Sequence, residues 1–183
     1  LRYPAADLDE TIYRPERQLD TQTIERLSTC HWIEEGKNLI VTGSSASGKN
    51  YLINAFCVIA MKQSKSVKYI KANTLMSEME QACIKSTNLE YLNKLTKLDL
   101  LMIDDFGLMD LDFAKCRDLF EVFDTRDGRK STVVILQFPV STWFNMFAGN
   151  TYADAASSFS DRTSSQIMRR SSVNFRGGKE YDC

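Results

Sequence analysis

The residues best suited to chemistry in this chain run from Gly43 to Asn50, in the order Gly-Ser-Ser-Ala-Ser-Gly-Lys-Asn. Two glycines separated by four residues and followed by lysine form the pattern of a phosphate-binding P-loop, which usually ends in Ser or Thr. The glycines permit close backbone approach, the loop amides attract an anion, and Lys49 adds a full positive charge. The pattern predicts a nucleotide site in which Asn50 is the departure.

An acidic pair at the end of an apolar run is the second chemical signal. Residues 98–105 read Leu-Asp-Leu-Leu-Met-Ile-Asp-Asp, which predicts a buried strand ending in two carboxylates. Opposite a phosphate loop, we expect Asp104 to hold Mg²⁺ through water and Asp105 to orient and deprotonate the attacking water. Many ATPases of this kind have Glu at the second position, and Asp is shorter by one methylene.

The segments beside the glycine-bearing loop are those that must position it. Residues 38–42 form a short β-branched run that predicts a buried parallel strand. Residues 51–61 are apolar on nearly every side and contain no Gly or Pro, which predicts a buried helix. Strand, loop and helix in this order are the context in which a P-loop pattern is meaningful.

The rest of the chain alternates between helical and strand patterns, which predicts an α/β fold with a parallel sheet. Asn73 is the expected N-cap of one helix. Residues 1–20 are expected to be an irregular leader, the remnant of a linker to a missing N-terminal region, and residues 21–183 one domain. Further strands are predicted at 67–71 and 132–136, and helices at 21–35, 73–85, 88–95 and 112–126.

Composition limits the other possibilities. The chain has 183 residues, 43% of them hydrophobic, and a net charge of -1, which gives no general attraction to nucleic acid or membranes. No apolar run has the length of a membrane span. The five cysteines lack ligand-like spacing, which favours reduced thiols in a cytosolic protein, and the single His31 is interpreted as a structural loop residue.

Four segments occur in the order seen in one known family: residues 32–40 (Trp-Ile-Glu-Glu-Gly-Lys-Asn-Leu-Ile), the P-loop, residues 103–108 (Ile-Asp-Asp-Phe-Gly-Leu) and residues 137–143 (Gln-Phe-Pro-Val-Ser-Thr-Trp). In these segments the chain resembles the IstB-like ATPases, AAA+ proteins that assist transposition of insertion sequences. They are relatives of the DnaC and DnaI helicase loaders, and the sequence leaves open which of the two roles applies.

The resemblance implies a P-loop NTPase fold of the AAA+ type, with a five-stranded parallel sheet flanked by helices. It implies ATP and Mg²⁺ as cofactors, and ATP hydrolysis coupled to assembly on DNA with a transposase or a replicative helicase. It also implies a cytoplasmic homo-oligomer. Gly-Lys-Asn is similar to a variant found in DnaC-type loaders, where the amide oxygen of a residue like Asn50 can face a magnesium-bound water.

The resemblance also implies roles for single residues. Gln137 falls at the sensor position after the last central strand, where an amide can orient water. Arg162 resembles the arginine finger that enters a neighbouring subunit's site, although Arg169 or Arg170 could align there instead. The metal ligands would be Asn50 and Asp104, and the catalytic residues Asp105, Gln137 and Arg162. The nucleotide-binding residues would be Gly43, Ser44, Ser45, Ala46, Ser47, Gly48, Lys49, Asn50 and Tyr51.

The C-terminal region departs from the family pattern. Residues 176–182 contain no arginine at the position that should reach the nucleotide within the same subunit, and Lys179 could replace it only as a point charge. Two hypotheses therefore stand: an ATPase, with activity that is weak, or a degenerate nucleotide-binding scaffold with little or no hydrolysis.

Overall fold

The computed structural model describes residues 5, 6, 8, 21–43, 49–106, 112–138, 142 and 163–169, the last range by its backbone. The helices are α1 (Thr21–Ser28), α2 (His31–Glu34), α3 (Lys49–Lys62), α4 (Ala72–Ile84), α5 (Asn88–Lys97) and α6 (Phe113–Arg126). The strands are β1 (Asn38–Gly43), β2 (Val67–Lys71), β3 (Leu100–Phe106), β4 (Ser131–Leu136) and β5 (Thr163–Arg169).

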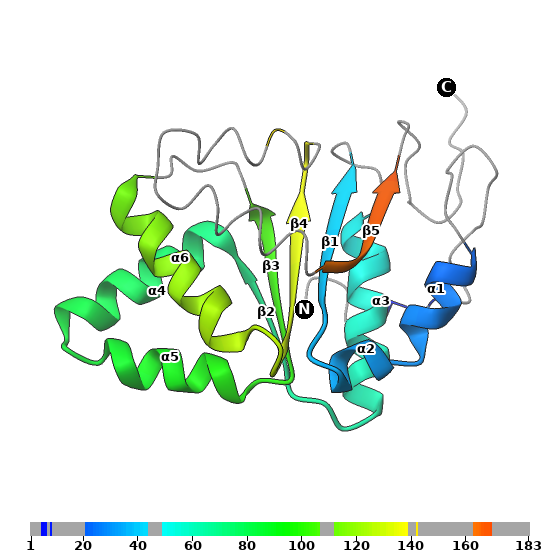
Figure 1. The fold of residues 1–183 in the computed structure, drawn as a ribbon, viewed down its shortest axis with the longest axis horizontal. Coiled ribbons are helices and arrows are strands. Elements are labelled where there is room, and N and C mark those ends of the chain that lie inside the picture. Colours follow the sequence, from blue (N-terminus) through cyan, green and yellow to red (C-terminus); the bar gives the residue numbers. More distant parts are fainter. Residues whose placement is uncertain are drawn as a thin grey trace.

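The five strands form one sheet in the order β2-β3-β4-β1-β5 (Figure 1). Every neighbouring pair is parallel. This confirms the predicted α/β fold with a five-stranded parallel sheet flanked by helices. The sequence pattern did not locate β5, because its residues 163–169 are largely polar and lie within a Ser-rich stretch.

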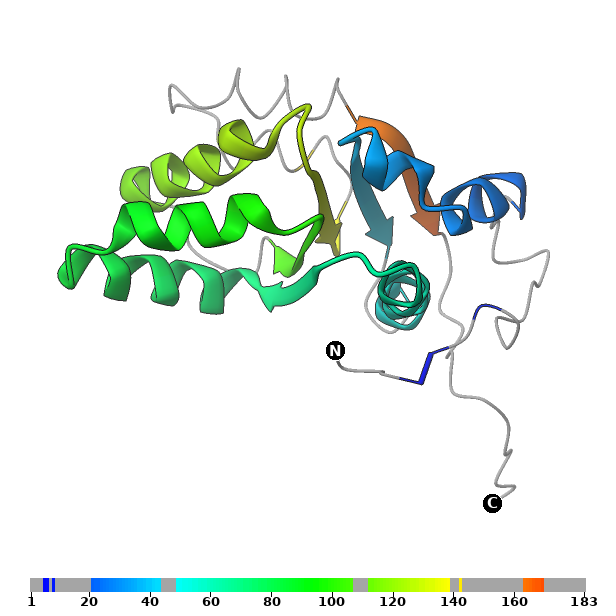
Figure 2. The same ribbon diagram turned by 90° about the horizontal axis from the view of Figure 1, so that it is seen from below.

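The strands bury both faces, so alternate residues enter two different cores. Ile40 packs in a cluster with α4, α5 and α6, whereas its neighbours Leu39 and Val41 pack in a second cluster with α1, α2 and α3. Figures 1 and 2 show α4, α5 and α6 grouped beside β2, β3 and β4. Burial on both faces explains why the strands read as continuous apolar runs.

The single helix predicted for residues 21–35 was wrong. The helix is interrupted between α1 and α2, where Cys30 adopts a left-handed backbone conformation with φ 60°. The indole Nε1 of Trp32 donates to the Leu27 carbonyl across the break at 2.9 Å, so burial of the indole stabilises a turn. His31 is therefore the first residue of α2, and not a loop residue as predicted.

The predicted N-cap of α4 was also wrong. The helix begins at Ala72, and its N-cap is Lys71, which makes no side-chain capping hydrogen bond. Ala72 is fully buried, so tertiary packing moves the N-cap two residues closer to β2 than the capping preference of Asn73 indicated. No helix in the described ranges is long and apolar enough to span a membrane.

Candidate functional site

The residues singled out in the sequence gather where neighbouring strands end. β1 ends at Gly43, β3 carries Asp104 and Asp105 near its end, and Gln137 follows β4. These three strands are adjacent in the sheet and parallel, so their carboxyl ends share one edge. In open α/β sheets this edge is where ligands bind.

Lys49 occupies the first position of α3 and is 6% exposed. Its ammonium group donates to the carbonyl oxygen of Gly43, the last residue of β1. The lysine thus spans the two ends of the glycine-bearing loop. Its charge and the α3 N-terminus both favour an anion at this position.

Asn50 joins the loop helix directly to the acidic strand. Its amide Nδ2 donates to the Asp104 carboxylate at 2.9 Å. The backbone carbonyl oxygen of Asn50 accepts a 2.6 Å hydrogen bond from the side-chain Nδ2 of buried Asn54. Since Nδ2 faces Asp104, the same amide retains its Oδ1 as an acceptor or a metal ligand.

Asp104 is 2% exposed and accepts hydrogen bonds from three groups. Asn50 and the Tyr69 hydroxyl donate to Oδ2, and the backbone N–H of Asp105 donates to Oδ1 at 2.8 Å. A buried polar group needs such hydrogen-bond partners to offset the free-energy cost of leaving water. The strand end therefore presents a fixed, hydrogen-bonded carboxylate beside Asn50.

Asp105 leaves the regular strand geometry. The register of β3 against β4 shifts between Ile103 and Phe106, and Asp105 has a left-handed φ of 54°. Bulges of this kind re-aim side chains and are common beside active sites, and a non-glycine residue at positive φ is strained. The irregularity sends the two adjacent carboxylates to different partners.

The Asp105 carboxylate lies between the ends of β2 and β4. Lys71 forms an ion pair with it at 2.7 Å, and the Gln137 amide nitrogen lies 3.5 Å away. The Asp105 side chain is 26% exposed, so solvent reaches it, in contrast to Asp104. The structure thus brings two of the three expected catalytic side chains, Asp105 and Gln137, into contact.

Sequence reasoning missed Tyr69 and Lys71. Both come from β2, whose alternating pattern predicted a strand but not its neighbour. In the sheet, Tyr69 lies opposite Met102 and Lys71 opposite Asp104. The polar groups of Tyr69 and Lys71 near the carboxyl end of the strand were the available signal, but the strand order was needed to interpret it.

Several predicted residues lie outside the described part of the chain. They are Ser44, Ser45, Ala46, Ser47, Gly48, Arg162 and Arg170. Of the other candidates, Tyr51 is half-buried in α3. The backbone of Arg169 pairs with Gly43, which places this residue at the carboxyl edge beside the start of the loop.

Residues 1–166 of this chain match the protein family described as "IstB-like ATP binding protein". The chain belongs to this family. Two relatives carry provisional names as insertion sequence ATP-binding proteins. One, from Sinorhizobium fredii, is 33% identical over 155 residues, which cover 85% of this chain and 62% of that protein. The other, from Pseudomonas fluorescens, is 34% identical over 142 residues, covering 78% and 62%.

This IstB-like chain spans about three fifths of the length of those relatives. Among solved structures, AMPPCP-bound DnaA from Aquifex aeolicus has a TM-score of 0.75 at 19% identity, covering 90% of this chain and 50% of that one. The DnaC helicase loader has a TM-score of 0.74 at 18% identity, covering 92% and 99%. These likenesses show the AAA+ P-loop fold, and the family match makes this an IstB-like ATP-binding domain.

Proposed function

We propose that this IstB-like domain binds Mg²⁺–ATP at the carboxyl edge of its sheet and hydrolyses it. The observation that carries the proposal is the 2.9 Å hydrogen bond between Asn50 and Asp104. It couples the helix that begins with the P-loop lysine to the strand that ends in the acidic pair. This contact supports the proposal, because the two segments it joins are those from which an ATPase centre would be built.

The residues at this edge fit a magnesium ion. Mg²⁺ takes oxygen ligands, retains several waters, and is usually held by one or two protein groups together with phosphate oxygens. The Asp104 carboxylate and the Asn50 amide oxygen supply two such groups. Bound there, the metal would neutralise charge on the outer phosphates.

The other side chains then have separate roles. Lys49, held beside Gly43, would exchange its carbonyl partner for phosphate oxygens. Asp105 would accept the proton of the attacking water, and Gln137, 3.5 Å from that carboxylate, would orient the water. Arg162, Arg169 or Arg170 would supply the arginine that stabilises transition-state charge.

The proposed partners are DNA and a transposase, and ATP would promote assembly of a homo-oligomer in the cytoplasm. Relatives named for insertion sequences favour the transposase, whereas the fold shared with the DnaC helicase loader supports a replicative helicase as the alternative. Because the net charge is -1, DNA contact would require a local basic patch or other parts of the protein.

A nucleotide-binding scaffold without appreciable turnover is the second candidate. The ion pair between Lys71 and Asp105 favours it, because a carboxylate already held by a cation must release that partner before it can contact the attacking water. The shorter reach of Asp at this position acts in the same direction.

Nucleotide titration and phosphate release test both candidates. We expect Lys49→Ala to lower ATP affinity at least about 100-fold, since a buried charge for the phosphates is lost, while exposed Lys37→Ala binds normally. An unchanged ATP affinity of Lys49→Ala would refute the assignment of this loop as the nucleotide site. Phosphate release should then be measured with and without DNA on the full-length protein; ATP binding with background release under both conditions would favour the scaffold.

A further inference from the structure

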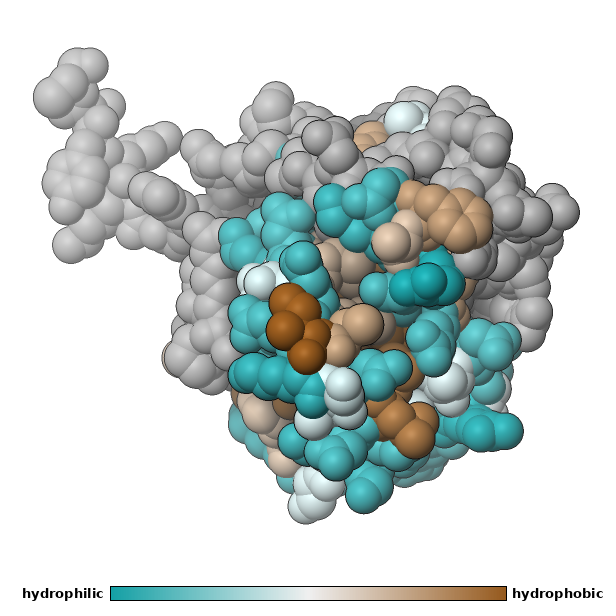
Figure 3. Space-filling view, turned by 90° about the vertical axis from the view of Figure 1, so that its left-hand side faces the viewer, coloured by the Kyte–Doolittle hydropathy of each residue, from teal (hydrophilic) through white to brown (hydrophobic). Residues whose placement is uncertain are grey.

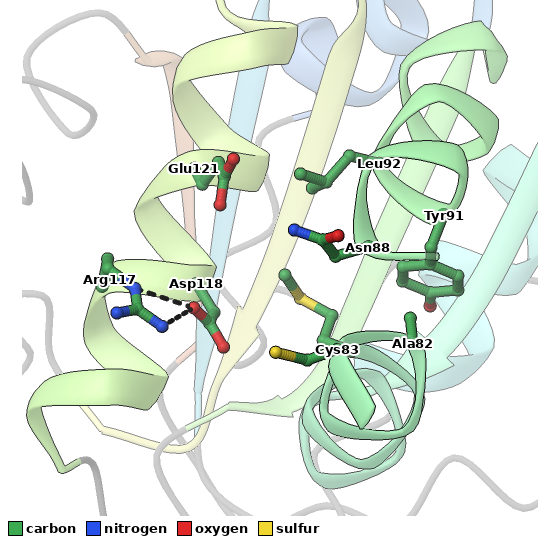
Figure 4. A pocket seen from close by; sticks show the side chains of 9 residues that line it. Ala82, Cys83, Asn88, Tyr91, Leu92, Arg117, Asp118 and Glu121 are labelled. Carbon is green, nitrogen blue, oxygen red and sulfur yellow. Dashed lines mark hydrogen bonds and ion pairs between the residues drawn. The ribbon is translucent and has the colours of Figure 1, made fainter. Parts of the chain in front are cut away.

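A cavity of about 210 Å³ lies between α4, α5 and α6, and none of its lining residues belongs to the nucleotide site. Figure 4 shows side chains from all three helices facing it. Its floor is apolar and largely buried: Met79 and Ala82 of α4 are each 7% exposed, and Leu92 of α5 is 5% exposed.

The size of the cavity limits what it can hold. Sites for small molecules and cofactors usually have volumes of about 300–1,000 Å³, so this cavity is too small for a nucleotide or a similar ligand. It is large enough for one bulky apolar side chain. Its apolar floor under a polar rim is the usual form of a pocket that receives an anchor residue at a protein interface.

Exposed apolar side chains lie near the lining residues along the chain. Ile84 and Leu89 follow the lining residues Cys83 and Asn88, and are 77% and 68% exposed. Phe113, 57% exposed, lies one helical turn before lining residue Arg117. Among the described residues these are three of the four large hydrophobic side chains with high exposure. Figure 3 shows apolar side chains among polar ones on this face.

The charge of α6 indicates the chemistry of the occupant. Asp118, Glu121 and Asp124 recur every third residue and so follow one side of the helix. Arg117 donates to its neighbour Asp118 at 3.0 Å. No ion pair engages Glu121 or Asp124 within the described residues. Of the acidic residues that line the cavity, Glu121 is thus available to an outside cation, which favours a basic segment of protein over nucleic-acid phosphates.

We propose that the cavity between α4, α5 and α6 receives one large apolar side chain from a segment of a partner protein. A Lys or Arg beside that anchor pairs with Glu121. The inference is independent of the nucleotide site, since it uses no residue of that site and requires no bound ATP.

The test uses fluorescein-labelled peptides and the full 183-residue chain. The probe has a central Leu flanked by lysines in a Gly-Ser background; one control replaces Leu by Gly, and the other replaces the lysines by glutamates. In fluorescence polarisation, each control peptide should bind at least about threefold more weakly than the probe. A threefold loss is the effect expected from removing one partly exposed ion pair, and loss of the apolar anchor should cost at least as much. Equal affinity for all three peptides overturns the proposal, as does the absence of saturable binding.

Charge reversal then locates the contact. Glu121→Lys should weaken binding of the lysine peptide at least about threefold and strengthen binding of the glutamate peptide. Glu25→Lys, at an exposed position of α1, should change the affinity for neither peptide. Cys83 is exposed and Cys30, Cys57 and Cys116 are buried. In a Cys183→Ser background, bound lysine peptide should therefore slow maleimide labelling of Cys83.

Binding without protection of Cys83, or binding insensitive to Glu121→Lys, would place the peptide elsewhere and overturn the proposal. A wild-type chain that self-associates in sedimentation, and loses this association in Glu121→Lys, would identify a second copy as the occupant and also overturn it. Tighter binding of single-stranded DNA by Glu121→Lys than by Glu25→Lys, without peptide binding by the wild type, would identify nucleic acid instead.

Discussion

At the amino edge of the sheet, the Arg126 guanidinium is 1% exposed and donates to the carbonyl oxygens of Leu95, Leu98 and Ser131 and to the Thr132 hydroxyl. Burial lowers its pKa to about 10. At the carboxyl edge, polar groups contact Asp104 and Asp105. There most partners are other side chains, which can exchange the carboxylates for a ligand; the exception is the backbone N–H of Asp105, which donates to Asp104.

Backbone geometry separates the two edges further. Amino-edge partners belong to the ends of regular elements, as when the Asn38 side chain accepts from the Thr132 N–H at 3.0 Å. At the carboxyl edge, Asp105 is held at φ 54° in an irregular strand. A polar cluster that bonds to backbone fixes the fold, whereas one held in a strained backbone by exchangeable side chains is prepared for chemistry.

The largest expected effect is on turnover. Asp105→Asn should lower phosphate release about 100-fold or more, because the proton acceptor is lost. Stability in urea should change by less than about 1 kcal/mol, since Asn tolerates a left-handed backbone and the lost ion pair with Lys71 is partly exposed. Asp124→Asn on exposed α6 is the matched control. A loss of stability without a loss of turnover would place Asp105 among the structural residues.

Arg126→Met should have the opposite profile. Removing the buried guanidinium leaves several carbonyl oxygens without donors, so the free energy of unfolding should fall by about 3 kcal/mol. ATP affinity of the folded fraction should stay within about twofold, because no Arg126 partner reaches the carboxyl edge. Urea denaturation and nucleotide titration measure the two quantities, with exposed Arg129→Met as control. An unchanged unfolding midpoint would contradict the structural role.

Tyr69→Phe should have a smaller effect, specific to the metal. The variant keeps the ring but removes one donor to the Asp104 carboxylate, which costs on the order of 1 kcal/mol of positioning. The Mn²⁺ concentration for half-saturation with ATP should rise about threefold in electron paramagnetic resonance titrations, with ATP affinity in EDTA unchanged. Tyr91→Phe is the control, and an equal shift in both variants would argue against a role for Tyr69.

The smallest expected effect is on acid stability. The hydrogen bond from Lys130 and those from Ser66 hold the pKa of the Asp99 carboxyl well below its usual range. A lowered folded-state pKa stabilises the fold above the unfolded value of about 3.9, and this stabilisation is lost as the pH falls through the folded value. Because the side chain is partly exposed, we expect at most about 1 kcal/mol.

Asp99→Asn should accordingly be less stable than wild type at neutral pH and should lose less stability on acidification, as measured by urea unfolding between pH 6 and about pH 3. ATP affinity should not change. Parallel stability curves for the two proteins would show that the ion pair with Lys130 contributes nothing measurable.

Most of the fold could be predicted from the sequence, because buried parallel strands and amphipathic helices have strong local patterns. β2 has the predicted bounds, and β1 and α6 differ by one residue at one end. The break at Cys30 and the location of β5 could not be predicted. The first depends on burial of Trp32, and the second on pairing between residues 163–169 and β1.

For the site, the sequence by itself determined the residues with a chemical signature: the loop that ends in Lys49 and Asn50, the acidic pair and Gln137. Their spacing along the chain is a local property of strand, turn and helix. Only the tertiary structure decided which contacts their side chains make. The strand order brings Tyr69 to Asp104 and Lys71 to Asp105, and the bulge separates the two carboxylates. Such contacts between distant residues arise from packing and leave no periodic trace in the sequence.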